Sequence, residues 1–159
     1  DVERSRGLGD VYKRQGMVDV GDKNISQRTA VATATVHLSE EAFNAAVEGR
    51  VPKGDVFTVA ETAGILAAKR TWEILPLCHQ IPLDQVSLSF KTILEDHAIE
   101  IRATVKAHAK TGAEMEALTA ASVAALTVYD MCKGIDPSIT ITDVMLIYKE
   151  GGKSGVYRR

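Results

Sequence analysis

The segment RTAVATATVHL, residues 28–38, alternates small apolar side chains with a second set that is mostly polar. Side chains two positions apart share one face of a β-strand, and β-branched residues favour strands. One face of this segment carries Ala30, Ala32, Ala34, Val36 and Leu38. The segment therefore predicts a strand with one apolar face.

The strand leads into two expected helices. Ser39 stands as an N-cap before two glutamates, and Gly49 ends the first, short helix. A loop over residues 51–55 follows. The capping-box spacing of residues 58–61 predicts the start of the second helix, which we expect to run to about residues 72–75.

Two further strands, a long helix and a last strand complete the pattern. The loop 76–82 is bracketed by prolines and is therefore stiff and non-helical. Residues 86–90 and 99–105 alternate with period two and predict a hairpin. The helix expected over 114–133 is rich in alanine and apolar nearly all round, which is typical of burial on several sides. Residues 139–148 predict the last strand.

The order strand, helix, helix, strand, strand, helix, strand contains one hairpin and two crossovers. It predicts an α+β fold with a ferredoxin-like antiparallel sheet and helices packed on one face. Residues 1–16 carry four basic and three acidic residues and little apolar periodicity. We expect them to be a disordered or non-native N-terminal tail, so that the folded domain spans residues 17–159.

Composition and charge exclude several classes of protein. The 159 residues are 45% hydrophobic and 25% charged, which fits one globular domain. The 19 Lys and Arg residues against 21 Asp and Glu give a net charge of −2, unlike a protein that coats nucleic acid. No apolar run approaches the roughly 18 residues of a membrane span. Two cysteines, Cys78 and Cys132, without a secretory signal indicate a reduced protein. We expect a cytoplasmic protein with no nucleic-acid or membrane partner.

Candidate polar residues lie in the connections between these elements. Lys53 stands in the loop between two helix breakers, Pro52 and Gly54, which favours a functional position, although a solvated loop lysine is the alternative. His79 follows Cys78 in the stiff loop and suits either a general acid or base or a structural hydrogen bond. Because an adjacent Cys and His lack the spacing of a closed metal site, no metal site is predicted.

The two ends of the long helix also carry charged candidates. Asp130 lies in the last turn, where the helix dipole disfavours a carboxylate by about 0.3–1 kcal/mol. Lys133 shares its face, so the two form either a plain ion pair or a tuned proton-transfer pair. At the other end, Glu114 takes the N3 position of a capping box begun by Thr111, and Glu116 is a first-turn acid. The 16 residues from Glu114 to Asp130 span about 24 Å of helix. Either one end alone is functional, or two copies of the chain contribute opposite ends to one site.

Six segments form a pattern that covers the chain from residue 17 to residue 155. They are MVDV at 17–20, KGD at 53–55, AAKRTW at 67–72, LCH at 77–79, TGAEMEALTAASVAALTVYDMCK at 111–133 and GGKSG at 151–155. Together they closely resemble the MoaC family, the cyclic pyranopterin monophosphate synthases of molybdenum cofactor biosynthesis. The long helix block is the most specific part of this resemblance.

The resemblance implies a phosphorus–oxygen lyase that converts 3′,8-cyclo-7,8-dihydro-GTP to cyclic pyranopterin monophosphate and pyrophosphate. It implies a ferredoxin-like subunit in a homohexamer, a trimer of dimers with active sites at the dimer interfaces. No cofactor is required, and Mg²⁺ bound to the triphosphate is compatible with this reaction. The catalytic domain is then residues 17–159.

The resemblance also implies roles for individual residues. By position, the catalytic residues are Asp130, Lys53 and Lys133. The substrate-binding residues are Leu77, Cys78, His79, Met115, Glu116, Glu114, Arg28, Lys23 and Lys149. Lysines would stabilise departing pyrophosphate, and carboxylates would accept hydrogen bonds from the guanine-derived ring. The alternatives are a non-catalytic, nucleotide-binding regulatory module, and an RNA-binding domain, which would need exposed stacking aromatics.

Overall fold

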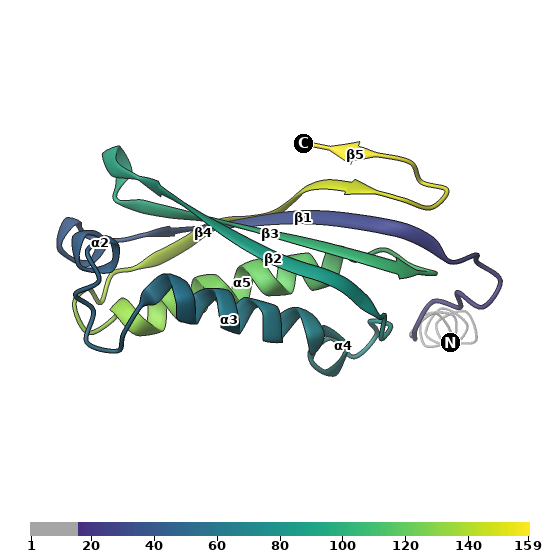
Figure 1. Cartoon of the computed structure of the whole chain (residues 1–159), viewed down its shortest axis with the longest axis horizontal. Coiled ribbons are helices and arrows are strands. Elements are labelled where there is room, and N and C mark those ends of the chain that lie inside the picture. Colours follow the sequence, from purple (N-terminus) through teal and green to yellow (C-terminus); the bar gives the residue numbers. More distant parts are fainter. Residues whose placement is uncertain (1–15) are drawn as a thin grey trace, which may run out of the picture.

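The computed structural model describes residues 16–159 as one antiparallel sheet with helices beneath it (Figure 1). The tail predicted over residues 1–16 lies, apart from Gly16, outside the described residues. The strands are β1 (Ser26–His37), β2 (Leu83–Ile93), β3 (Ala98–Ala109), β4 (Thr140–Glu150) and β5 (Tyr157–Arg158). The helices are α2 (Glu40–Val47), α3 (Val56–Lys69), α4 (Thr71–Ile74) and α5 (Glu114–Cys132), with a 3₁₀ turn at Leu94–Asp96.

The sheet has the strand order β2-β3-β1-β4-β5, and every neighbouring pair is antiparallel. The first four strands and their two helical crossovers form a ferredoxin-like arrangement. The predicted hairpin of β2 and β3 is present, with Val86 opposite Val105. The predicted fold class and element order are therefore confirmed, with β5 as a short addition at the edge.

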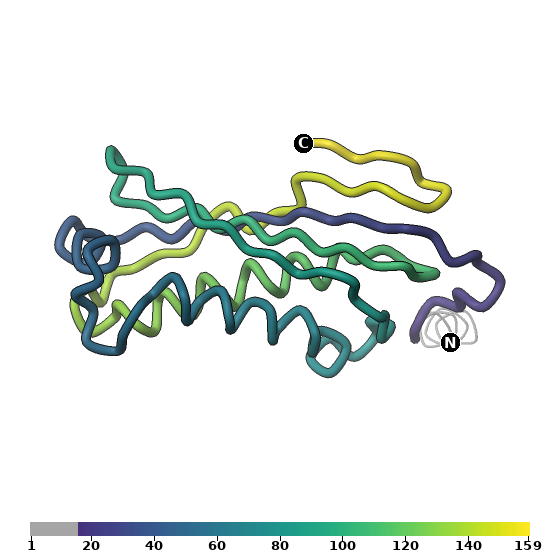
Figure 2. Tube along the Cα trace, viewed as in Figure 1, coloured from purple at the N-terminus to yellow at the C-terminus, as the bar shows by residue number. Residues whose placement is uncertain are grey.

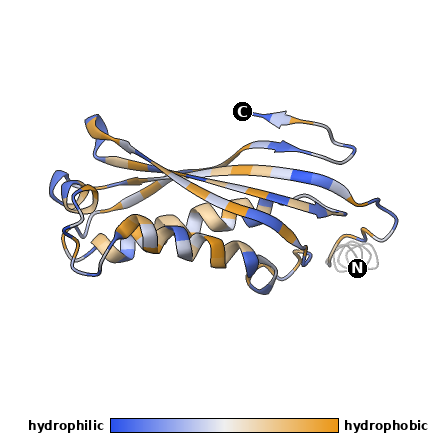
Figure 3. Cartoon of the chain, viewed as in Figure 1, coloured by the Kyte–Doolittle hydropathy of each residue, from blue (hydrophilic) through white to orange (hydrophobic). Residues whose placement is uncertain are grey.

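The core lies between the sheet and the pair α3 and α5, which run side by side in opposite directions (Figure 2). The predicted inner face of β1 is buried, and hydrophobic colouring follows most of α5 (Figure 3). The buried alanines of α5 are Ala117, Ala120, Ala121, Ala124 and Ala125. Their small side chains let α5 pack against α3, β1, β3 and β4 at once.

One glycine marks how closely these layers approach. A Cβ added at Gly64 of α3 would come within 2.5 Å of Leu88 Cδ2 and 3.1 Å of the Ala120 carbonyl oxygen. Gly64 therefore occupies a place where a larger side chain would push α3 away from α5 and the sheet.

Helix boundaries differ from the prediction at α3. The predicted cap of α2 is confirmed, because Ser39 Oγ accepts a hydrogen bond from the Ala42 N–H at 3.2 Å. The capping box predicted at residues 58–61 is wrong: Asp55 Oδ1 accepts from the Thr58 N–H at 3.0 Å, so α3 begins at residue 56. The predicted single helix also breaks at Arg70, where α3 ends and α4 begins.

Throughout residues 16–159, no helix combines the length and the apolar character that a membrane crossing requires.

Candidate active site

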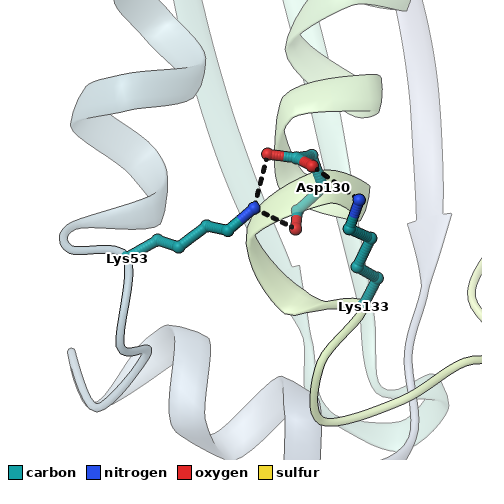
Figure 4. Close-up of polar contacts among 3 residues, drawn as sticks. All are labelled: Lys53, Asp130 and Lys133. Atoms are coloured by element: carbon teal, nitrogen blue, oxygen red, sulfur yellow. Dashed lines mark hydrogen bonds and ion pairs between the residues drawn. The ribbon is translucent and has the colours of Figure 1, made fainter.

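Asp130 lies between two lysines at the C-terminal end of α5 (Figure 4). Lys53 Nζ donates to Asp130 Oδ2 at 2.9 Å, and Lys133 Nζ is 3.0 Å from Oδ1. Two hydrogen bonds lower the pKa of Asp130, the larger effect coming from Lys53 and the next from Lys133. The carboxylate is therefore ionised at neutral pH. The side chains of Asp130, Lys53 and Lys133 are 55%, 52% and 55% exposed, so this cluster is an open surface of the single chain.

The packing of α3 against α5 brings Lys53 to this position. The two helices run in opposite directions, so the loop before α3 reaches the end of α5 (Figure 1). Gly54 has a φ of +118°, a conformation that side-chain-bearing residues rarely adopt, and it lets the loop turn directly into α3. Lys53 Nζ also donates to the Asp130 carbonyl oxygen at 3.2 Å. That carbonyl is one of the last four of the helix, which have no partner within it. Lys53 therefore offsets both the carboxylate and the negative helix end.

A second group of candidate residues surrounds the N-terminal end of α5. An open pocket of about 440 Å³ lies between this helix end and the stiff loop after α4. Five of the predicted binding residues line it: Leu77, Cys78, His79, Glu114 and Met115. The loop and the helix end together thus present an imidazole, a thiol and a carboxylate to one cavity.

A smaller, polar pocket of about 170 Å³ adjoins the first and shares Thr111, Gly112 and Glu114 with it. Lys23 and Lys149 line it, together with Arg28. Lys149 Nζ is 3.0 Å from Glu114 Oε1. The structure therefore gathers eight of the nine predicted binding residues around two adjoining pockets.

Glu116 is the ninth predicted binding residue, and it lies behind the wall of the larger pocket. Its residue surface is 3% exposed, and Cys78 Sγ donates to its Oε2 at 3.7 Å. Burial raises the pKa of Glu116 above its usual value. Burial and the charge of Glu116 raise the pKa of Cys78 to about 11, so Cys78 remains a thiol at neutral pH.

Glu114 does not belong to the predicted capping box. The helix begins at Glu114 itself, and Ala113 precedes it without a side-chain cap. The Glu114 carboxylate instead lies over Gly112, where an added Cβ would come within 2.3 Å of Oε2. Thr111, expected as a cap, and Gly112, which was not among the predicted site residues, line both pockets. The Thr-Gly break before the helix was the available signal.

The two groups of residues lie at opposite ends of α5. The 16 residues between Glu114 and Asp130 correspond to about 24 Å of helix, as predicted from the sequence. Within the described residues, no cluster of three or more His, Cys, Asp or Glu side chains is arranged to hold a metal ion.

Comparison with known proteins agrees with the family resemblance seen in the sequence. The sequence model of the MoaC family matches residues 17–152. A cyclic pyranopterin monophosphate synthase of Geotalea uraniireducens is 55% identical over 143 residues, covering 90% of this chain and 89% of that protein. The protein of the same name from Pelobacter propionicus is 54% identical over the same shares. That from Thermoanaerobacter sp. is 49% identical over 92% of each chain.

Proposed function

Because the chain belongs to the MoaC family, we propose that it is an enzyme of molybdenum cofactor biosynthesis that acts as a cyclic pyranopterin monophosphate synthase. One observation in the structure supports this most directly. Asp130 is held between Lys53 and Lys133 by side-chain contacts of 2.9 and 3.0 Å. An ionised carboxylate that orients two ammonium groups suits a reaction with several proton transfers and an anionic leaving group.

The proposed reaction is that of a phosphorus–oxygen lyase. It converts 3′,8-cyclo-7,8-dihydro-GTP to cyclic pyranopterin monophosphate. Rebuilding the purine into a pterin requires ring opening and reclosure, and each step moves protons. A sugar-derived hydroxyl then gives up its proton to a base of the site as its oxygen bonds to the α-phosphorus, the bond from this phosphorus to the oxygen that bridges to the β-phosphorus breaks, and pyrophosphate leaves with its charge. No resident cofactor is part of this proposal, while Mg²⁺ on the triphosphate is compatible with it.

The proposed roles follow from the position of each group. Lys53 and Lys133 exchange protons with the substrate or neutralise the phosphates, and Asp130 orients them. The 440 Å³ pocket is of a size for a small-molecule ligand, and its His79 and Glu114 offer hydrogen bonds to a bicyclic ring. The polar pocket presents Lys23 and Lys149 to the phosphate oxygens.

We further propose that two copies of the chain complete each site, in a hexamer built as a trimer of dimers. The distance of about 24 Å along α5 separates the two groups within one copy. Large apolar side chains on the helices support association of this kind, because Val59, Leu66 and Leu126 are 42%, 48% and 57% exposed. The catalytic cluster of one copy would face the pockets of the other.

A pyrophosphate-release assay tests the proposed function. Purified protein incubated with 3′,8-cyclo-7,8-dihydro-GTP should release one pyrophosphate for each pterin formed, with the pterin identified by mass spectrometry. A regulatory module would bind a guanine nucleotide reversibly and release no pyrophosphate. Substrate binding without pyrophosphate release would therefore contradict the proposal and favour that alternative.

A further inference from the structure

The Arg28 side chain, near the start of β1, contacts three backbone carbonyls at the ends of two other strands: that of Ala109, the last residue of β3, and those of Lys110 and Gly151, which directly follow β3 and β4. Its Nε donates to the Ala109 oxygen at 3.3 Å, and its Nη2 donates to the Lys110 oxygen at 3.2 Å. Its Nη1 donates to the Gly151 oxygen at 3.5 Å. The backbone pairing of β1 with β4 ends at Thr29 and Glu150. The guanidinium therefore continues the connection between strands where the backbone pairing stops.

The chain opposite the guanidinium has no Cβ where one would collide. Gly152 has a φ of +72°, and a Cβ there would come within 2.3 Å of Arg28 Nη1 and 2.8 Å of its Cζ. Gly155, in the same turn, has a φ of +70° and nothing within 4 Å of its Cβ position. The two glycines have nearly the same φ, but of the two only Gly152 leaves space for Arg28.

This glycine turn, residues 151–155, forms part of the wall of the polar pocket. Gly151 and Ser154 line the pocket with Lys23 and Lys149. Lys149 stands two residues before the turn and holds the Glu114 carboxylate. Movement of the turn would therefore alter the position of the cationic groups on this side of the pocket.

We propose that Arg28 is a positioning residue that clamps the glycine turn against the ends of β1 and β3, and that Gly152 is the space the clamp requires. The forked geometry of the guanidinium is essential here, since a lysine ammonium is a single point of charge and cannot reach three separate carbonyls. The effect on turnover rests on the proposed function, whereas the mobility of the turn does not. The clamp should set the affinity for the phosphate-bearing substrate more than the rate of the chemical steps.

The test compares Arg28→Lys, Gly152→Ala and the matched control Gly155→Ala, each checked for a native circular dichroism spectrum. We expect Arg28→Lys and Gly152→Ala to raise KM about tenfold, with kcat within about threefold of wild type. Gly155→Ala carries the same backbone strain without the collision, so we expect its KM to rise less than about threefold. A KM for Arg28→Lys equal to that of wild type would show that charge alone suffices, and would overturn the proposal.

A double-mutant cycle tests the contact itself. In an Arg28→Ala background the collision is absent, so Gly152→Ala should raise KM no more than Gly155→Ala does. An undiminished tenfold effect of Gly152→Ala in that background would contradict the clamp.

Hydrogen exchange of the backbone amides of residues 151–155 provides a readout without substrate. We expect exchange to be about tenfold faster in Arg28→Lys than in wild type. Unchanged exchange would overturn the clamp. An inactive wild-type protein would instead count against the proposed function and leave the exchange result as the test of the clamp.

Discussion

Lys53 Nζ and Asp130 Oδ2 are 2.9 Å apart, although 77 residues of sequence separate them. The lysine belongs to the loop before α3, and the aspartate belongs to the last turn of α5. Only the antiparallel packing of these two helices brings the ammonium to the carboxylate. The pair is exposed, so its contribution to stability is small.

Replacement of Lys53 by Ala or of Asp130 by Asn should lower kcat by about 10²–10⁴, because each change removes a group positioned for proton transfer or charge stabilisation. The melting temperature should stay within a few degrees of wild type, since these side chains are exposed. Steady-state kinetics with the cyclised nucleotide and thermal unfolding measure the two effects. Arg50→Ala is the matched control, because Arg50 forms an exposed ion pair with Glu48 at 2.7 Å just before the same loop. Full turnover by the Asp130 variant would refute its catalytic role.

Mixed assemblies should recover activity if each site uses two copies of the chain. Lys53→Ala damages the cluster at the C-terminal end of α5, and Glu114→Ala damages the pockets at its N-terminal end. A dimer with one copy of each variant therefore contains one doubly damaged site and one intact site. Equal amounts refolded together should regain about a quarter of wild-type activity, since half of randomly formed dimers are mixed. Mixing Lys53→Ala with Asp130→Asn is the control, because those changes share one end and restore no site. No recovery in the first mixture would mean that the site lies within one copy.

The variant Glu116→Gln should become more stable than wild type as the pH rises. The raised pKa of Glu116 means that the folded state holds its proton more tightly than the unfolded state does. The Glu116 carboxyl therefore makes wild type less stable as the pH rises from 4.5 to its folded-state pKa, by at most about 1.4 kcal/mol for each pH unit in that interval. Gln stays neutral, so its advantage should be absent in acid, grow through this interval and then remain constant.

Urea unfolding at a series of pH values measures this difference in the free energy of unfolding. Glu61→Gln, on the exposed face of α3, is the control for the same change of side chain at a surface position. A Glu116→Gln curve that runs parallel to wild type at every pH would show that burial does not perturb this carboxyl.

Replacement of Gly112 by Ala should weaken substrate binding without unfolding the protein. The new Cβ would displace the flexible end of the Glu114 side chain and so break its contact with Lys149. We expect KM to rise about tenfold, since a hydrogen bond to a charged group contributes about 1.5–3 kcal/mol. Gly134→Ala is the control, because nothing lies within 4 Å of its Cβ position. An unchanged KM in the Gly112 variant would show that Glu114 tolerates another position.

The fold could be predicted to a large extent because its signals are local. The apolar side chains that alternate along residues 28–38 are buried, as expected. The alanines of α5 are buried as well. Of the predicted helix caps, the N-cap at Ser39 is confirmed. The capping boxes predicted to begin at Thr58 and Thr111 are wrong. Several capping spacings fit the same stretch of sequence, and the packing around each helix end decides which one forms.

The order of elements, the small-residue core and membership of the family follow from the sequence alone, because periodicity, composition and motifs are properties of the chain. The tertiary structure decided that Lys53 meets Asp130, that Glu114 pairs with Lys149 and not with a cap, and that Arg28 reaches three carbonyls. Such contacts join segments 35 to 123 residues apart. They form only once the packing of helices on the sheet fixes the relative positions of those segments.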